Sequence, residues 1–264
     1  MKKNILRELI DTGKPTLSTR MLTMSPQIVE MIGHSGAFDF IELAGEYASW
    51  TLPDFENFAR AVELFPRMSS MIKVEKEPRL HITQRALGTG IQNVLFTDCN
   101  TAEEVVECIQ LVRPGTPQDG GSHGISMRRS VAYGLENTSP EWLKAMRDVV
   151  IAVMIESDVA VNNLDEILSV RGLDMVRFGP ADYSLSIGRI GQERSAEVQK
   201  VHRQVIEIAL KKRVRPQVVI SSFEEAREYV DMGIRDFCVG NDLGILYRWC
   251  RTNGKMMREM LERK

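Results

Sequence analysis

Two carboxylates follow apolar runs in the second half of the chain. Glu156 comes directly after the run 149–155, and Asp182 stands in Gly-Pro-Ala-Asp, just after a run that ends at Phe178. If both runs are strands of one parallel sheet, the two acids meet at its carboxyl edge, which suits Mg²⁺ or Mn²⁺. Such an ion can chelate a 2-oxo acid and stabilise the enolate that forms on deprotonation. The alternative is that Glu156 is a helix N-terminal acid and Asp182 a turn or cap residue.

The elements around these acids alternate between short apolar runs and segments with helical spacing, the pattern of alternating strands and helices. Eight strands are expected, each followed by a helix: 16–24, 38–43, 68–74, 93–96, 149–155, the run ending at 178, 217–220 and 236–240. Eight such units predict an α/β fold, a (β/α)₈ barrel that forms a single domain over 1–264, with its active site at the strand C-termini. A doubly wound open sheet is the alternative.

The last helix, expected over 243–264 with an interruption at 252–254, is too long for one barrel helix. We expect it to pack on a neighbouring subunit, so the protein is predicted to be a homo-oligomer.

The composition is that of an ordinary globular protein, with 43% hydrophobic and 27% charged residues and a net charge of -2. No basic excess indicates a nucleic-acid partner, and no apolar run suggests a signal peptide or a membrane span. The four cysteines lack metal-ligand spacing. These features predict a cytoplasmic protein with neither nucleic-acid nor membrane partners.

Two further cations could contact a substrate. Arg20 is a long cation inside an apolar strand, and it either binds a substrate carboxylate or pairs structurally with Glu42. His123 lies in the Gly- and Pro-rich segment 114–138, which we interpret as an active-site loop insertion because loops of this length are usually functional or disordered. His123 could meet the distal carboxylate of a substrate, or it could simply be a solvated loop histidine.

The segments that end in Glu156 and in 179–188 resemble the metal-dependent 2-oxo-acid aldolases of the HpcH/HpaI type, within the wider citrate-lyase-like group. The run Gly-Pro-Ala-Asp-x-Ser-x-Ser-x-Gly is the more specific part, and 38–46 and 239–243 support it. The resemblance implies a (β/α)₈ barrel with a divalent metal, Mg or Mn, on Glu156 and Asp182. It also implies reversible cleavage of a 4-hydroxy-2-oxo acid to an aldehyde and pyruvate, and an oligomer with swapped C-terminal helices, dimer-based or extended to a hexamer.

Substrate contacts are expected from the segment that carries Asp182: from the backbone of Gly179, Pro180 and Ala181, and from Ser184.

The chain departs from the family pattern beside the metal site. Members carry Asp-Gly-Glu-His after the second strand, where this chain has Ala44-Gly45-Glu46-Tyr47. Lys73 replaces an arginine that holds the substrate, and Met154 replaces a glutamine. The metal ligands are therefore retained while the proton-transfer groups differ.

Three hypotheses account for these changes. In the first, the chain is an active carbon–carbon lyase in which Tyr47, with its pKa lowered by metal and cations, transfers protons. Lys73 then neutralises the enolate, and Glu46 bonds a metal-bound water; a Schiff base on Lys73 ranks below this role. In the second, the same enolate chemistry serves decarboxylation or condensation of another 2-oxo acid. In the third, the barrel binds a metabolite without turnover.

Overall fold

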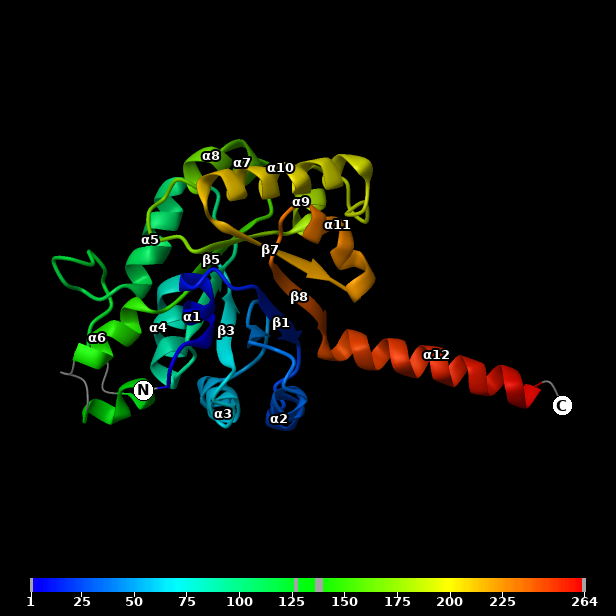
Figure 1. The fold of residues 1–264 in the computed structure, drawn as a ribbon, viewed down its shortest axis with the longest axis horizontal. Coiled ribbons are helices and arrows are strands. Elements are labelled where there is room, and N and C mark those ends of the chain that lie inside the picture. Colours follow the sequence, from blue (N-terminus) through cyan, green and yellow to red (C-terminus); the bar gives the residue numbers. More distant parts are fainter. Residues whose placement is uncertain (1, 126–127, 136–139, 263–264) are drawn as a thin grey trace.

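Eight parallel strands close into a barrel in the computed structural model, which describes residues 2–125, 128–135 and 140–262 (Figure 1). The strands are β1 (Thr16–Met21), β2 (Phe40–Ala44), β3 (Ser69–Val74), β4 (Asn93–Phe96), β5 (Ile151–Ile155), β6 (Met175–Phe178), β7 (Arg215–Ile220) and β8 (Asp236–Asn241). Each strand pairs with the next, and β8 returns to pair with β1. The predicted barrel is thus confirmed, and the open sheet is excluded.

Helices surround the barrel. They are α1 (Ile5–Asp11), α2 (Pro26–Ser35), α3 (Leu52–Glu63), α4 (Arg79–Thr89), α5 (Ala102–Val112), α6 (Pro140–Arg147), α7 (Asp158–Asn162), α8 (Leu164–Ile167), α9 (Pro180–Ser186), α10 (Ala196–Lys212), α11 (Ala226–Asp231) and α12 (Asp242–Glu262), with 3₁₀ turns η1 (Arg129–Gly134) and η2 (Phe223–Glu225). The expected caps are present: the Ser25 side chain accepts the amide of Ile28, and that of Thr101 accepts the amide of Glu104. The single helix expected around 163–170 is instead the pair α7 and α8.

The N-terminal end of the barrel is closed by α1, a helix that the sequence interpretation missed. Its Leu6 is fully buried and packs with inward-facing side chains such as Phe40, Met71 and Met175. The amide of Ile5 donates to Ser69 Oγ at 2.8 Å. Because this end is plugged, ligands can approach the barrel interior from the opposite end, where the strands finish.

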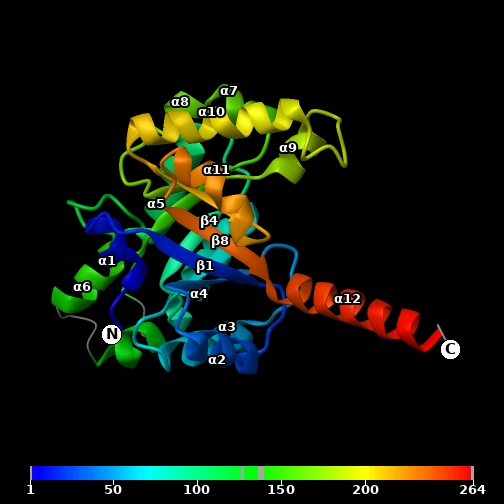
Figure 2. The same ribbon diagram turned by 45° about the vertical axis from the view of Figure 1, so that its right-hand side comes forward.

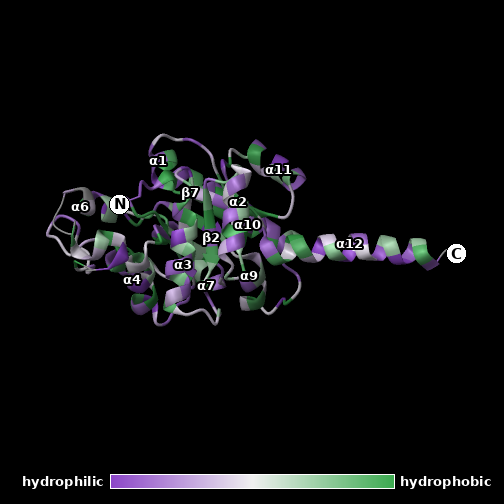
Figure 3. Cartoon of the chain, turned by 90° about the horizontal axis from the view of Figure 1, so that it is seen from below, coloured by the Kyte–Doolittle hydropathy of each residue, from purple (hydrophilic) through white to green (hydrophobic). Residues whose placement is uncertain are grey.

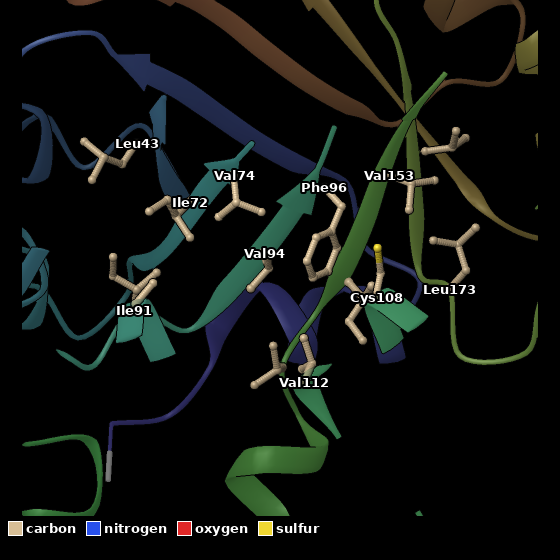
Figure 4. Packing of buried hydrophobic residues seen from close by; sticks show 14 of the residues in the cluster. Leu43, Ile72, Val74, Ile91, Val94, Phe96, Cys108, Val112, Val153 and Leu173 are labelled. Atoms are coloured by element: carbon tan, nitrogen blue, oxygen red, sulfur yellow. The ribbon is translucent and has the colours of Figure 1, made fainter. Parts of the chain in front are cut away.

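A second apolar layer lies between the barrel and the helices (Figure 4). Ile72 and Val74 of β3 belong to it, whereas Met71, directly before Ile72, faces the barrel interior. This alternation follows from the two-residue period of a strand. It also assigns the inward positions, which carry the polar side chains described below.

The segment after α5 lies along the outer flank of the barrel. Pro114 and His123 form a short bridge, and Arg129 of η1 forms an ion pair with Glu63 of α3. In Figures 1, 2 and 3 this region and α6 lie on the side opposite α12, which begins where β8 ends. The described residues of the predicted active-site loop therefore contact the flank, while 126–127 and 136–138 lie outside the described residues.

The C-terminal helix α12 projects from the barrel (Figures 1 and 2). It is continuous through 252–254, so the expected interruption is wrong; a single glycine weakens a helix by about 1 kcal/mol, too little to end a 21-residue helix. None of its residues is buried, and apolar side chains such as Leu246, Trp249 and Met260 are exposed among polar ones (Figure 3). No described helix, α12 included, is both long and apolar enough to span a bilayer.

Candidate active site

Glu156 lies at the open end of the barrel, on the side formed by β5. It follows β5 directly, is 5% exposed, and accepts the backbone N–H of Asp98 at Oε1 over 2.9 Å. Burial raises the pKa of Glu156 to about 7, and nearby Asp182 and Asp98 add to the increase against the opposing effects of that N–H and Lys73. The carboxylate is thus held in a place where its negative charge is poorly compensated.

Gly179 makes the space that Glu156 occupies. Ile155 and Phe178 are register partners, so Glu156 and Gly179 stand side by side just beyond the strands. A Cβ on Gly179 would lie 2.8 Å from Glu156 Cβ and 2.9 Å from its Oε2. The amide of Gly179 donates to Ile155 O at 2.9 Å, so it is not free for a substrate as the sequence had suggested.

Asp182 lies in the first turn of α9, where Pro180 occupies the first helical position. Its side chain is exposed, and it is close enough to Glu156 to raise that residue's pKa. The structure therefore brings the two predicted metal ligands to the same end of adjacent strands. Ser184 is buried and its hydroxyl donates to Ala181 O at 2.8 Å, an arrangement that keeps the hydroxyl within its own helix.

Asp98 is a third carboxylate at this end, and the sequence interpretation missed it. It follows β4, has a left-handed backbone with φ of 51°, and donates its amide to Glu156. An aspartate tolerates this conformation better than most residues. Its place two residues after a buried strand was the available signal, but the stretch that follows it was interpreted only as the start of the next helix.

Lys73 and Glu46 form an ion pair at the mouth, with their side chains 16% and 10% exposed. Gly45 allows this approach, because its N–H donates to Lys73 O at 2.9 Å and a Cβ there would lie 2.7 Å from that oxygen. Two of the three residues predicted to act in catalysis are therefore together, and Lys73 is close enough to Glu156 to oppose the increase in its pKa.

Tyr47 differs from expectation. It is 92% exposed, with φ of 58°, and its pKa is raised, chiefly by the negative charge of the adjacent Glu46. Without a bound metal, acidic groups outweigh the effect of Lys73 around the Tyr47 hydroxyl, so the role of Tyr47 in proton transfer stays a prediction that depends on the metal.

A buried polar network lies inside the barrel, beneath the mouth. Arg177 Nη1 donates to Glu42 Oε1 at 2.8 Å, its Nη2 contacts Oε2, and its Nε donates to Gln217 Oε1 at 3.2 Å. Burial opposes ionisation of Glu42, but Arg177, with smaller effects from Arg20 and Lys73, holds its pKa below the usual value. One interpretation of the sequence paired Glu42 with Arg20. The structure shows that its hydrogen-bonded partner is Arg177.

His123 is not brought to the mouth. It is buried and lines a cavity of about 740 Å³ between α3, α4, residues 123–125 and Arg128, and its Nδ1 has no hydrogen-bond partner among the described residues. Burial lowers its pKa, so the neutral imidazole is favoured. None of the carboxylates at the mouth lines this cavity.

The residues present fit a hard divalent cation. The described residues contain no group of three or more His, Cys, Asp or Glu side chains arranged for a metal, so the protein would supply two carboxylates, Glu156 and Asp182. Mg²⁺ is commonly held in this way, with waters and substrate in its remaining positions. Burial raises the pKa of Glu156 because little positive charge lies near it, and the absence of a side chain at Gly179 leaves room beside its carboxylate; both observations are compatible with a cation at this place.

Known proteins share this architecture. The model of the HpcH/HpaI aldolase/citrate lyase family matches residues 26–248. The 5-keto-4-deoxy-D-glucarate aldolase of Enterobacter sp. (strain 638) is 30% identical over 224 residues, 84% of each chain. The hydroxypyruvate/pyruvate aldolase of Delftia acidovorans is 28% identical over 235 residues, 87% of this chain and 83% of the relative.

Solved structures agree on the fold. An HpcH/HpaI aldolase/citrate lyase family protein from Burkholderia cenocepacia J2315 matches with a TM-score of 0.88 at 24% identity, over 97% of this chain and 100% of its own. A more remote match, CitE from Mycobacterium tuberculosis in complex with magnesium and acetate, has a TM-score of 0.56 at 12% identity over 89% and 87% of the two chains. With the family model covering most of its length, this chain belongs to the HpcH/HpaI aldolase/citrate lyase family.

Proposed function

We propose that this protein is a divalent-metal-dependent carbon–carbon lyase that cleaves or forms a bond in a 4-hydroxy-2-oxo acid through a pyruvate-type enolate. The observation that carries the proposal is Glu156, a buried carboxylate with its pKa raised to about 7, beside Asp182 and within the influence of Lys73. The aldolase names of the relatives support the reaction class.

Each group has a distinct role. A Mg²⁺ or Mn²⁺ ion on Glu156 and Asp182 would supply Lewis acidity toward the 2-oxo group of the substrate. Lys73 neutralises negative charge that develops on the enolate oxygen, as a point charge and without the bidentate geometry of an arginine. Glu46, held by Lys73, is the carboxylate available to exchange a proton at C3 of the 2-oxo acid. Ala181, on the turn before Asp182, supplies a backbone contact to the substrate.

Decarboxylation of a 2-oxo acid is the second candidate. Ala44 and the exposed Tyr47 stand where the family's proton-transfer pair is expected. If the 2-oxo acid carries a second carboxylate on C3, loss of that carboxylate as CO₂ leaves its bonding electron pair as the same enolate, and no proton has to be removed from a hydroxyl group. This reaction would therefore not need the proton-transfer pair that Ala44 and Tyr47 replace.

Exchange of the pyruvate methyl protons in D₂O tests the shared enolate step. With Mg²⁺ or Mn²⁺ we expect exchange that EDTA abolishes, and loss of at least 100-fold in Glu156→Gln and Asp182→Asn, because each removes a metal ligand. Arg60→Gln, on the exposed face of α3, is the matched charge-loss control and keeps full activity. Absence of exchange in the wild type with either metal would refute the enolate mechanism.

The same proposal includes a homo-oligomer in which α12 packs on a neighbouring subunit. Its support is the projecting helix with exposed Leu246, Trp249 and Met260, since monomers rarely expose apolar side chains in this number along one helix. Light scattering should give at least a dimer, and deletion of 243–264 should give a monomer. A monomeric full-length protein would exclude it.

A further inference from the structure

Arg20 faces the interior of the barrel. On β1, the Thr16 hydroxyl donates to Asp236 at 2.6 Å, and Ser18 Oγ accepts from Gln217 of β7 at 3.1 Å, so both point inward. Arg20 is the next residue with the same parity, and a strand alternates its side chains with a period of two. It is therefore the inward residue of β1 nearest the open end.

Arg20 is the unpaired cation of the barrel wall. The eight strands, all within the described residues, contain four cations, and three have ion pairs: Lys73 with Glu46, Arg177 with Glu42, and Arg215 with Asp236. Arg20 has no ion pair, and its Nε is buried without a hydrogen-bond partner in the described part of the chain.

The neighbouring acid compensates the charge of Arg20 only in part and makes no hydrogen bond with it in the described residues. Glu42 is its register partner on β2, yet both Glu42 oxygens accept hydrogen bonds from Arg177. A half-buried guanidinium that keeps a buried N–H unsatisfied is costly, on the order of 1–3 kcal/mol. A carboxylate that arrives with the substrate would satisfy it, most effectively through the two parallel bonds that arginine can make.

The substrate carboxylate that Arg20 could bind is not the one beside the 2-oxo group, which is expected near Glu156 and Asp182. In an eight-stranded closed barrel β1 lies opposite β5, the strand that carries Glu156. Strands about 4.8 Å apart and tilted by about 36° give a barrel about 15 Å across. The arginine and glutamate side chains span much of that width, which leaves room between them for a short carbon chain with a charged group at each end.

We propose that Arg20 binds the distal carboxylate of the substrate, so that the protein prefers 2-oxo acids with a second carboxylate over those with an uncharged end. The inference rests on the proposed function, because it takes the 2-oxo end of the substrate to be held by the groups around Glu156.

Deuterium exchange at C3, in Mg²⁺ and D₂O, tests the preference with length-matched acids. The pairs are 2-oxoglutarate against 2-oxopentanoate and 2-oxoadipate against 2-oxohexanoate, which differ at the distal end. We expect kcat/KM for the better diacid to exceed that of its monoacid by about tenfold or more, the size of a charge-assisted hydrogen bond. In Arg20→Gln the ratio should fall to near one while monoacid exchange stays within about threefold of wild type. Arg20→Lys should keep part of the preference.

The outcomes separate the two proposals. Arg60→Gln serves as the charge-loss control and should keep the wild-type ratio. A wild type that exchanges diacids and monoacids alike, or an Arg20→Gln variant that keeps the preference, overturns the inference while the enolate mechanism stands. Absence of exchange with pyruvate and all four acids overturns the proposed function, and the inference with it. Equal melting temperatures of the variants establish that folding is not the cause.

Discussion

Replacing Arg177 by Met should strongly destabilise the protein. Glu42 and Arg177 are 0% and 2% exposed, and they form two hydrogen bonds with each other inside the barrel. The substitution leaves a charged carboxylate without its counter-ion in a site that water does not reach. Removal of one member of a buried pair costs about 3–5 kcal/mol, and we expect a loss of this size in the free energy of unfolding at pH 7.5.

The double variant Glu42→Leu with Arg177→Met distinguishes this explanation from simple loss of packing. With both charges absent, the remaining cost is chiefly Gln217 Oε1, which loses its arginine donors. An unsatisfied buried acceptor costs about 1–3 kcal/mol, so the double variant should be about 2 kcal/mol more stable than the Arg177→Met single variant. The two substitutions are thus expected to couple.

Urea unfolding followed by circular dichroism measures these values, at one protein concentration because self-association would shift them. The destabilisation in Arg177→Met should also shrink as the pH falls toward 5. An uncompensated buried Glu42 has a raised pKa in the folded state, so the folded protein takes up its proton first and gains stability at lower pH. Two results would refute the reasoning. One is a loss below about 1 kcal/mol in Arg177→Met, and the other is a loss in the double variant that equals the sum of the losses in Arg177→Met and Glu42→Leu measured separately.

Three further outcomes are expected. Gly179→Ala should lose metal-dependent exchange and about 1–3 kcal/mol of stability, because its Cβ would lie 2.8 Å from Glu156 Cβ. Gly254→Ala, inside α12 with open space around it, should keep exchange and gain up to about 1 kcal/mol, and equal behaviour of the two variants in exchange and urea unfolding would contradict this. Burial lowers the pKa of His202 from 6.5 to about 4. As the pH falls from 6.5 to 4, the unfolded chain takes up the proton before the folded protein does, so the free energy of unfolding should decrease by about 3 kcal/mol. In His202→Phe, unfolding curves measured across this pH range should show a smaller decrease. Tyr47→Phe should leave exchange rates within about twofold of wild type, and a 100-fold loss would restore the hydroxyl as the acid/base group.

The barrel could be predicted because its elements are defined by local patterns. The strand 93–96 agrees with the structure to the residue, and the caps at Ser25 and Thr101 were evident from residue type alone. Glu156 and Asp182 were found for the same reason, since each comes shortly after a buried strand. The position of a residue relative to a strand end can be recognised from the local sequence, and the barrel brings all the strand C-termini to one end of the molecule.

Contacts between distant parts of the chain were not visible in this way. Glu42 and Arg177 are 135 positions apart and lie on β2 and β6, so no spacing relates them, and Arg20 was the more obvious partner because it is the cation nearer in sequence. His123 was misleading for a related reason. A glycine-rich loop can reach the mouth or lie on the flank, and only its contacts with α3 and α4 decide between the two.

The charges that remain unpaired at the mouth link metal binding to substrate choice. Glu42 and Glu46 each form an ion pair with a cation. Three other carboxylates have no ion pair in the described residues, those of Glu156, Asp98 and Asp182. Arg20, which also has none, lies on the opposite wall of the barrel. A dianionic substrate would meet this excess of negative charge at one end and a free guanidinium at the other. A divalent cation held by Glu156 and Asp182 would offset two of these three negative charges and offer vacant coordination positions, so that both sides of the mouth could then bind a carboxylate. We therefore interpret the retained acids and Arg20 as acting together: a divalent cation on Glu156 and Asp182 would favour the binding of a diacid that extends across the mouth to Arg20.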